Sequence, residues 1–217
     1  MSSYQDNQKK IVDIIQNEVK RRLKGESSGH DYWHCYRVVQ TALVIGRKEK
    51  ANLYVLELAC WLHDSMIVES KKDHEVKGAL FAEKLLRQLN VNKGIVEKVS
   101  QCIRKHRFSK GIHADTLEEK ILQDADKLDA LGALGLARLF TLGGKYGQIL
   151  HDPQLKPSFA YYLQHGRSNS TMNHFTDKLF KLKKLLHTSA ARNIAIGREK
   201  YMREYVRRFY LEWEGKE

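Results

Sequence analysis

Hydrophobic side chains recur at helical spacing in nearly every long segment of this 217-residue chain. In the first segment they share one face of a helix, at Ile11, Ile14, Ile15 and Val19. The segment 53–64 is almost wholly apolar, which predicts a central, buried helix. No alternating strand pattern with hairpin turns competes with this periodicity. The sequence therefore predicts an all-α fold.

The predicted helices lie on either side of one irregular stretch. We expect helices over residues 31–48, 53–64, 73–89, 95–106 and 117–131, the last continuing through Gly132 and Gly135, then an apolar helical stripe over 175–186 and a long terminal helix over 190–213. Residues 143–171 contain both prolines and three closely spaced glycines, which predicts a long irregular connection. The length is typical of one domain. We therefore expect a single domain over 1–217, with its core at about 28–142, this loop, and C-terminal helices over about 172–213.

The composition restricts the class of protein. Three widely spaced cysteines, Cys35, Cys60 and Cys102, indicate buried thiols in a reducing compartment rather than a disulfide framework. The N-terminus is polar from its first residue, and no stretch approaches the roughly 20 apolar residues of a membrane span. We therefore expect a cytoplasmic location and no membrane partner. The net charge of +12 favours an anionic partner without selecting its class.

A few polar residues fall on helix faces that should point into the bundle. His34 shares a stripe with apolar residues of its helix, and the pair His63-Asp64 ends the most apolar segment of the chain. An ionised Asp64 at that place would be costly to bury unless it were paired or bound to a metal. These three residues are therefore candidates for chemistry in the interior.

The aspartates of segment 117–131 are separated by their helical positions. Asp124 lies with lysines on a polar face, so we expect it to be solvated and ion-paired, whereas Asp126 and Asp129 border the apolar stripe. Two imidazoles and two carboxylates from three inward-facing helices suit a divalent transition metal that keeps positions open for water and substrate. The sequence thus favours a site for Mn, Fe, Co, Ni or Zn at His34, His63, Asp64 and Asp126.

The same residues lie in a recurring motif pattern. It consists of HxxRV beginning at His34, ELACWLHD ending at Asp64, and LQDADKLDALGALGLAR around Asp126. This pattern resembles the HD-domain superfamily of metal-dependent phosphohydrolases. The phrase DADKLDALGALGLAR and the later MNHFTDKLFKL resemble its bacterial YpgQ-type subgroup, which is similar to nucleotide pyrophosphohydrolases. The resemblance covers about residues 30–213. It implies an HD-domain helical bundle with additional C-terminal helices, and it implies that His34, His63, Asp64 and Asp126 are the metal ligands.

The chain departs from the subgroup pattern after the His-Asp pair. An acid and a lysine usually follow that pair closely, whereas here Glu69 and Lys71 stand about two residues later. If the loop bulges, Glu69 takes the role of general base or water-positioning group, and Lys71 meets a phosphate. If it does not bulge, both residues are surface charges.

Three further residues are candidates for contact with a phosphorylated substrate. Arg37 lies one turn after His34 and could offset charge on a bridging oxygen, with an ordinary salt bridge as the alternative. Lys127 follows Asp126 but points one helical step away, so it reaches substrate only if the cleft wraps that edge. His106 should point inward at its helix end, where it donates a proton to the leaving group, binds a phosphate or caps the helix.

We expect one metal per chain and assign no other histidine to it. His74 stands at a charged helix start, and His151 and His165 fall in the irregular stretch. A second metal would need additional histidines, for which His106 and His113 are available. The position of His113 in a polar loop is poorly constrained, so the sequence favours the single site.

These expectations favour a hydrolase that splits (deoxy)nucleoside triphosphates into monophosphate and pyrophosphate. A nucleoside monophosphate phosphatase, or another phosphodiesterase of HD type, is the near alternative. A non-catalytic nucleic-acid-binding or regulatory HD module is the alternative from another class, and the excess of basic residues supports it. However, no helix-turn-helix, zinc finger or aromatic single-strand platform is visible. We therefore expect a small nucleotide as partner and no nucleic acid, and the sequence leaves an oligomer open.

Overall fold

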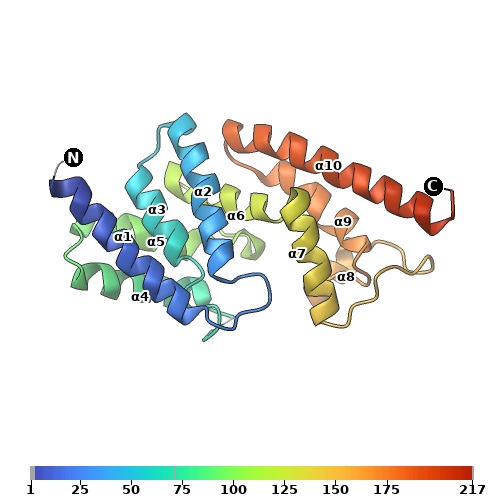
Figure 1. The fold of residues 1–217 in the computed structure, drawn as a ribbon, viewed down its shortest axis with the longest axis horizontal. Coiled ribbons are helices and arrows are strands. Elements are labelled where there is room, and N and C mark those ends of the chain that lie inside the picture. The colour runs from blue at the N-terminus through green and yellow to red at the C-terminus, as the bar shows by residue number, and fades with distance from the viewer. Residues whose placement is uncertain (1–2, 71, 217) are drawn as a thin grey trace. The chain divides into compact units, whose positions relative to one another are not determined.

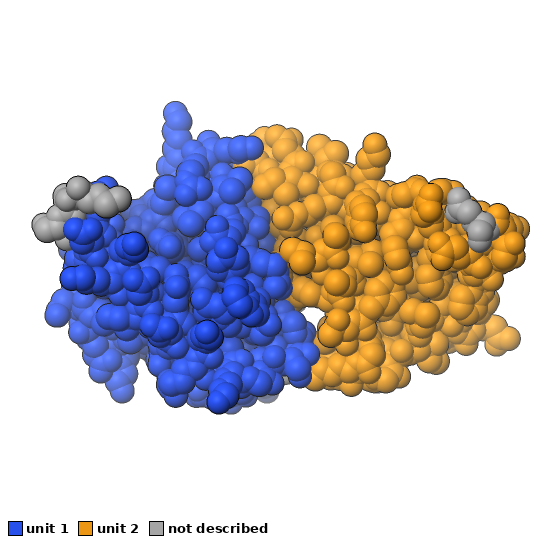
Figure 2. Space-filling model, in the orientation of Figure 1, with its two compact units in different colours: residues 1–126 blue, residues 127–217 orange. Residues whose placement is uncertain are grey.

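The computed structural model describes residues 3–70 and 72–216 (Figure 1). Within these residues the regular structure consists of α-helices and two short 3₁₀ helices, and no β-strand occurs. This confirms the all-α class. The chain divides into two compact units, Met1–Asp126 and Lys127–Glu217, coloured blue and orange in Figure 2. The single domain expected from the length stays a prediction.

The first unit is built around helix α3. Its elements are α1 (Ser3–Arg22), α2 (Tyr32–Glu49), α3 (Leu53–Leu62), α4 (His74–Gln88), α5 (Lys93–Lys105), the 3₁₀ helix η1 (Phe108–Lys110) and most of α6 (Leu117–Asp129). Helix α3 packs against α1, α2 and α5, and α4 packs against α5. Every residue from Leu58 to Leu62 is at most 1% exposed. The apolar segment is therefore the central, buried helix that the sequence predicts.

Local capping determines where α2 and α3 begin. The carboxylate of Asp31 accepts a hydrogen bond from the backbone N–H of His34 at 2.9 Å. The side-chain oxygen of Asn52 accepts one from the N–H of Val55 at 3.1 Å. Such caps satisfy backbone donors that have no partner within the helix. The first cap places His34 in the first turn of α2, and α3 ends directly before His63.

The continuous helix expected through Gly132 and Gly135 is wrong. Helix α6 ends at Asp129, and α7 (Gly132–Lys145) is a separate helix. Between them Leu131 is extended, with φ −116° and ψ 154°, and Gly132 has φ +80°. A positive φ is readily adopted only by glycine, so Gly132 permits the break inside an apolar pattern that is helical on both sides.

The second unit differs from the expectation in its middle part. Besides α7 it contains α8 (Phe159–His165), α9 (Asn173–Asp177), the 3₁₀ helix η2 (Leu179–Leu185) and α10 (Ser189–Trp213). The stretch 143–171 therefore includes the end of α7 and all of α8, and the stripe 175–186 forms α9 and η2 rather than one helix. Its apolar side chains are nevertheless buried, since Phe175 and Leu182 are 1% exposed. Helix α10 packs against α7 and η2.

The cysteines agree with the expectation from composition. Cys35, Cys60 and Cys102 are unpaired and buried. Burial raises the pKa of the Cys35 and Cys60 thiols well above their ordinary value, which keeps them protonated and unreactive. Among the described residues, no helix combines the length and the apolar character needed to cross a bilayer.

Candidate metal centre

Helices α2 and α3 bring His34 and His63 together inside the first unit. Neither imidazole has exposed surface, and their Nε2 atoms lie 3.2 Å apart. The Nδ1 atom of His63 lies 2.8 Å from the carbonyl oxygen of Cys60. Because a carbonyl oxygen only accepts, Nδ1 carries the proton, and in the neutral ring Nε2 offers its lone pair to the centre.

Two carboxylates complete this group. Asp64 Oδ2 lies 3.4 Å from His63 Nε2 and 3.6 Å from His34 Nε2. Asp126 Oδ1 lies 3.4 Å from His34 Nε2. Donor atoms that surround one ion at about 2.1 Å are about 3.0–3.5 Å apart in octahedral or tetrahedral geometry. The donor atoms of His34, His63 and Asp126 all lie within 4.8 Å of one another, and Asp64 Oδ2 approaches both imidazoles, so the residues present fit a divalent metal.

The electrostatics of the group also favour a cation. Burial opposes ionisation of Asp64, yet the imidazoles of His63 and His30 hold the pKa of its carboxyl well below the usual range. Burial likewise opposes the charged form of His63, but Asp64 and Asp126 raise its pKa to about 9. Without an ion, the buried negative charge is therefore balanced by protons on the imidazoles, and a divalent metal would replace those protons.

Three more histidines surround Asp64. His30 Nδ1 lies 2.7 Å from Oδ2 of the carboxylate. His106 Nε2 lies 3.5 Å and His74 Nε2 lies 3.3 Å from Oδ1. His106 points inward, as the periodicity of its helix predicts. His74, which the sequence left outside the site, is only 5% exposed and belongs to a possible ligand group with Asp64 and His106.

Sequence reasoning missed His30 and His74 for the same reason. Both flank a helix instead of lying on a periodic apolar face, since His30 precedes the cap of α2 and His74 is the first residue of α4. His30 stands four residues before His34, and this spacing is a weak signal that both rings face one side. Nothing in the spacing of His74 signals its position, because the loop after Asp64 determines it.

Glu69, the candidate general base after the His-Asp pair, lies at the surface of the first unit. Glu69 is 55% exposed, and its carboxylate forms an ion pair with Arg22 Nη1 at 2.6 Å. The same Nη1 lies 3.0 Å from the sulfur of Met66. Glu69 is thus engaged at the surface of the first unit by α1. Lys71 lies outside the described residues.

The remaining substrate candidates occupy different surroundings. Arg37 is half-buried on α2, one turn after His34. Lys127, the first residue of the second unit, is 2% exposed, and its Nζ lies 3.3 Å from His187 Nε2.

The other two aspartates of α6 are buried. Asp124 is fully buried, so the expectation of a solvated side chain is wrong. Asp129 is buried as predicted, but it pairs with Arg138.

A protein-family model and a curated relative match this chain. The model described as HD domain matches residues 32–131, a range that includes His34, His63, Asp64 and Asp126. The protein YpgQ of Bacillus subtilis is 35% identical over an alignment of 205 residues, and the match covers 91% of each of the two chains.

Solved structures agree with this match. The crystal structure of Bacillus subtilis YpgQ in complex with ADP has a TM-score of 0.74 at 31% identity and covers 95% of this chain and 100% of that one. The crystal structure of an HD-superfamily hydrolase from Bacillus thuringiensis has a TM-score of 0.75 at 32% identity, with coverage of 95% and 98%. At these identities the similarity extends beyond the fold to membership of the same protein family.

Proposed function

Since the chain belongs to the HD-domain family and is a metal-dependent phosphohydrolase of that family, we propose that its substrate is a (deoxy)nucleoside triphosphate, split into monophosphate and pyrophosphate. The observation that carries this proposal is the group of donors at His34, His63, Asp64 and Asp126, in which His34 Nε2 lies 3.2–3.6 Å from the donor atoms of the other three. The nucleotide class is supported by the YpgQ structure, which holds ADP.

The proposed ligands are the two imidazoles and two carboxylates of that group. Bound there, a divalent metal would supply a Lewis acid that lowers the pKa of a water molecule and neutralises phosphate charge. The chain itself contributes orientation. The Cys60 carbonyl holds the His63 ring in one tautomer. The ionised carboxylate of Asp64 accepts a hydrogen bond from His30 Nδ1 at 2.7 Å.

The other predicted residues have roles around this group. Arg37, one turn along α2 from His34, is proposed to offset charge on the bridging oxygen of the substrate. His106 contributes an imidazole whose Nε2 faces Asp64, an atom suited to proton donation or to metal binding. The general-base role of Glu69 and the phosphate contacts of Lys71 and Lys127 stay predictions. The ion pair of Glu69 with Arg22 would have to open for such a role.

Product analysis tests the proposed reaction. The purified chain, loaded in turn with Mn, Co, Ni, Fe, Zn or Mg, is given dATP, dGTP or a deoxynucleoside monophosphate, the phosphorus products are resolved, and binding to DNA is measured in parallel. Pyrophosphate released together with a monophosphate supports the proposal. Orthophosphate released from a monophosphate, with triphosphates untouched, would replace it by a phosphatase. Nucleic-acid binding without hydrolysis of any nucleotide would favour the non-catalytic module.

A matched pair of aspartates on α6 tests the site. Asp126→Asn removes a proposed ligand, whereas Asp124→Asn changes a buried aspartate two residues away that belongs to none of the ligand groups. We expect loss of hydrolysis in the first variant and retention in the second. Circular dichroism checks that both remain folded. Equal activity in the two variants would remove Asp126 from the site.

A cytoplasmic location stays a prediction from composition.

A further inference from the structure

One surface of the second unit combines aromatic rings with lysines. On helix α8, Phe159 is 46% exposed, and its ring lies nearly parallel to that of Tyr162, with centroids 6.2 Å apart. The ammonium of Lys181 lies 3.7 Å from the centroid of the Phe159 ring. That of Lys178 lies 5.8 Å from the centroid of the Tyr162 ring. These four residues, here called the aromatic–lysine surface, hold two positive charges beside exposed ring area.

The exposed charges around this surface are positive. Residues 153–184 contain one acid, and this acid, Asp177, is 1% exposed. The same segment contains six basic residues: Lys156, Arg167, Lys178, Lys181, Lys183 and Lys184. Glu199 pairs with Lys183 at 2.8 Å, whereas no carboxylate in the described part of the chain forms an ion pair with Lys178 or Lys181. These two ammonium groups are therefore available to an external anion.

The main chain under the aromatic–lysine surface is held in place. The hydroxyl of Ser158 caps the start of α8. The side chain of Asn173 donates a hydrogen bond to the carbonyl oxygen of Leu155 at 2.8 Å, which ties the segment before α8 to the start of α9. The ring of His174 packs edge-on against that of Tyr162, with centroids 5.6 Å apart. Because the surface is preorganised, a ligand would bind it at little cost in ordering.

Single-stranded nucleic acid is the polyanion that uses both the rings and the lysines. Its phosphates are attracted by cations, and its bases, which a duplex keeps stacked on one another, are free to stack on aromatic side chains. An acidic peptide would engage the lysines but leave the rings without an aromatic partner. A lipid surface would take up apolar side chains such as Leu163, which is 67% exposed on α8, but it would not require a ring. The requirement for a ring at position 159 therefore distinguishes these partners.

We propose that the aromatic–lysine surface binds single-stranded nucleic acid, with bases stacked on its two rings and phosphates held by its two lysines. Such binding is separate from hydrolysis at the proposed metal site, and it departs from the expectation that nucleic acid is not a partner. The rings and the lysines are separated in the chain and meet only in the fold, so the sequence shows no platform of this kind. Loss of one stacking ring typically weakens binding to a single strand by about 5–150-fold.

Fluorescence anisotropy of a labelled oligothymidylate tests this binding. The full, Mn(II)-loaded chain is titrated into the oligonucleotide at several salt concentrations. We expect Phe159→Leu to raise Kd by about 10-fold, because leucine keeps an apolar contact but offers no ring, whereas Phe159→Tyr should bind as the wild type does. Lys178→Ala/Lys181→Ala should also raise Kd. It should reduce the slope of log Kd against log salt by about 1.4, since each phosphate contact on a single strand contributes about 0.7.

A matched variant controls for charge. Arg203→Ala/Arg207→Ala also removes two cations from the second unit, but these are paired with Glu199 and Glu204 on α10. It should therefore change Kd by less than about twofold. Equal losses in the two double variants would reduce the binding to net charge and overturn the proposed surface.

Three other results would overturn the proposal. The first is no anisotropy change with the wild-type chain at low salt. The second is unchanged oligonucleotide binding by Phe159→Leu together with loss of binding to phosphatidylserine vesicles in Lys178→Ala/Lys181→Ala, which would assign the surface to lipid. The third is a raised KM for dATP in Phe159→Leu, which would place the surface in the substrate site. If the wild-type chain binds the oligonucleotide but hydrolyses no nucleotide, the proposed function falls while this inference stands.

Discussion

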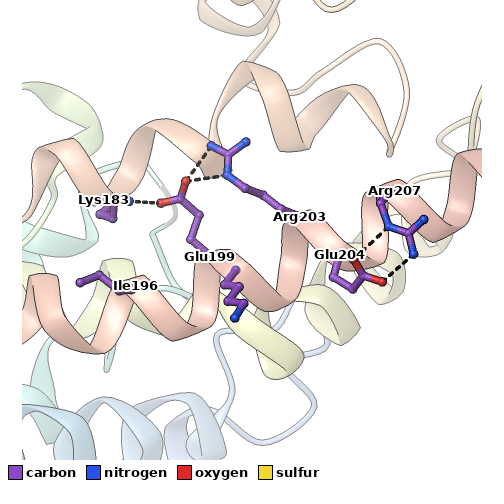
Figure 3. Close-up of a pocket in the computed structure, with 7 residues that line it drawn as sticks. Lys183, Ile196, Glu199, Arg203, Glu204 and Arg207 are labelled. Atoms are coloured by element: carbon purple, nitrogen blue, oxygen red, sulfur yellow. Dashed lines mark hydrogen bonds and ion pairs between the residues drawn. The ribbon is translucent and has the colours of Figure 1, made fainter.

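Charged groups gather in two regions of this protein. In one region buried carboxylates are surrounded by imidazoles, and in the other the acids form direct ion pairs with lysine and arginine. Inside the first unit, five imidazoles surround two carboxylates: His30, His34, His63, His74 and His106 with Asp64 and Asp126. On the second unit, a groove of about 570 Å³ is lined by Lys183, Ile196, Glu199, Lys200, Arg203, Glu204 and Arg207 (Figure 3). In the groove, charges meet as direct pairs at 2.6–2.8 Å, such as Arg203 with Glu199.

The comparison shows why net charge is a poor guide to chemistry. Residues 178–217 contain 11 basic and 5 acidic residues, which is +6 of the total of +12. Yet the acids of the groove are already paired with neighbouring cations, and exposed pairs of this kind contribute little. The buried group carries no surplus of basic residues, but its donors are spaced for an ion. Spacing and burial, rather than total charge, therefore point to the proposed metal site.

The largest expected effect is the loss of Asp64. We expect Asp64→Asn to lower kcat/KM by more than about 100-fold, because even the outer partners of metal ligands are worth about 10–100-fold. The matched change in the groove, Glu204→Gln, should leave kcat/KM unaltered. Steady-state hydrolysis of dATP by both variants measures the difference. Similar losses in both would show that the groove, too, belongs to the catalytic machinery.

Helix periodicity predicted those parts of the fold and site that lie on regular apolar faces. The burial of segment 53–64 follows from its almost wholly apolar composition, and the inward position of His106 follows from 3.6-residue spacing. The break at Gly132 could not be predicted in this way, because the apolar pattern continues across it and only the backbone conformation changes. Asp124 was mistaken for a solvated residue, since lysines on the same face do not reveal what packs over them.

The residues that sequence analysis missed are positioned by loops. His74 reaches Asp64 because the segment between α3 and α4 returns the chain to the end of α3, and ion pairs of Glu75 with Arg107 and Lys110 hold it there. These contacts join positions about thirty residues apart, and no local pattern encodes them.

The next largest expected effect is on stability: metal removal should lower the free energy of unfolding. At a Mn(II) concentration of about 100 times Kd, a ligand that binds only the native state adds about 2.7 kcal/mol. For a chain of this size that corresponds to a rise in Tm of about 5–10 °C. Thermal unfolding with and without a chelator measures it. The rise should persist in Glu204→Gln and disappear in the double variant His34→Ala/His63→Ala, and equal rises in both variants would place the bound ion elsewhere.

The same glycine-to-alanine change should have opposite effects on the free energy of unfolding in the two units. At Gly46 of α2, an added Cβ would lie 2.6 Å from Leu56 Cδ1, in the contact that holds α2 against α3. Gly46→Ala should therefore destabilise the protein by about 1–2 kcal/mol, after allowance for the better helix propensity of alanine. At Gly197 of α10, an added Cβ meets nothing within 4 Å, so Gly197→Ala should stabilise by about 0.5–1 kcal/mol. Urea unfolding at constant metal concentration measures both, and equal signs would contradict the difference in packing.

The smallest expected effect concerns the groove itself. Its basic side chains could raise the local concentration of a polyphosphate substrate through long-range attraction, although the acids between them cancel much of the field. Such attraction reaches about 30 Å at 0.01 M salt but only about 3 Å at 1 M salt. We therefore expect Arg203→Ala/Arg207→Ala to lower kcat/KM for dATP by less than about threefold at low salt and not at all at high salt, with kcat unchanged. A loss that persists at high salt, or that appears in kcat, would mean that these arginines touch the substrate, and the contrast between a catalytic interior and a paired surface would then fail.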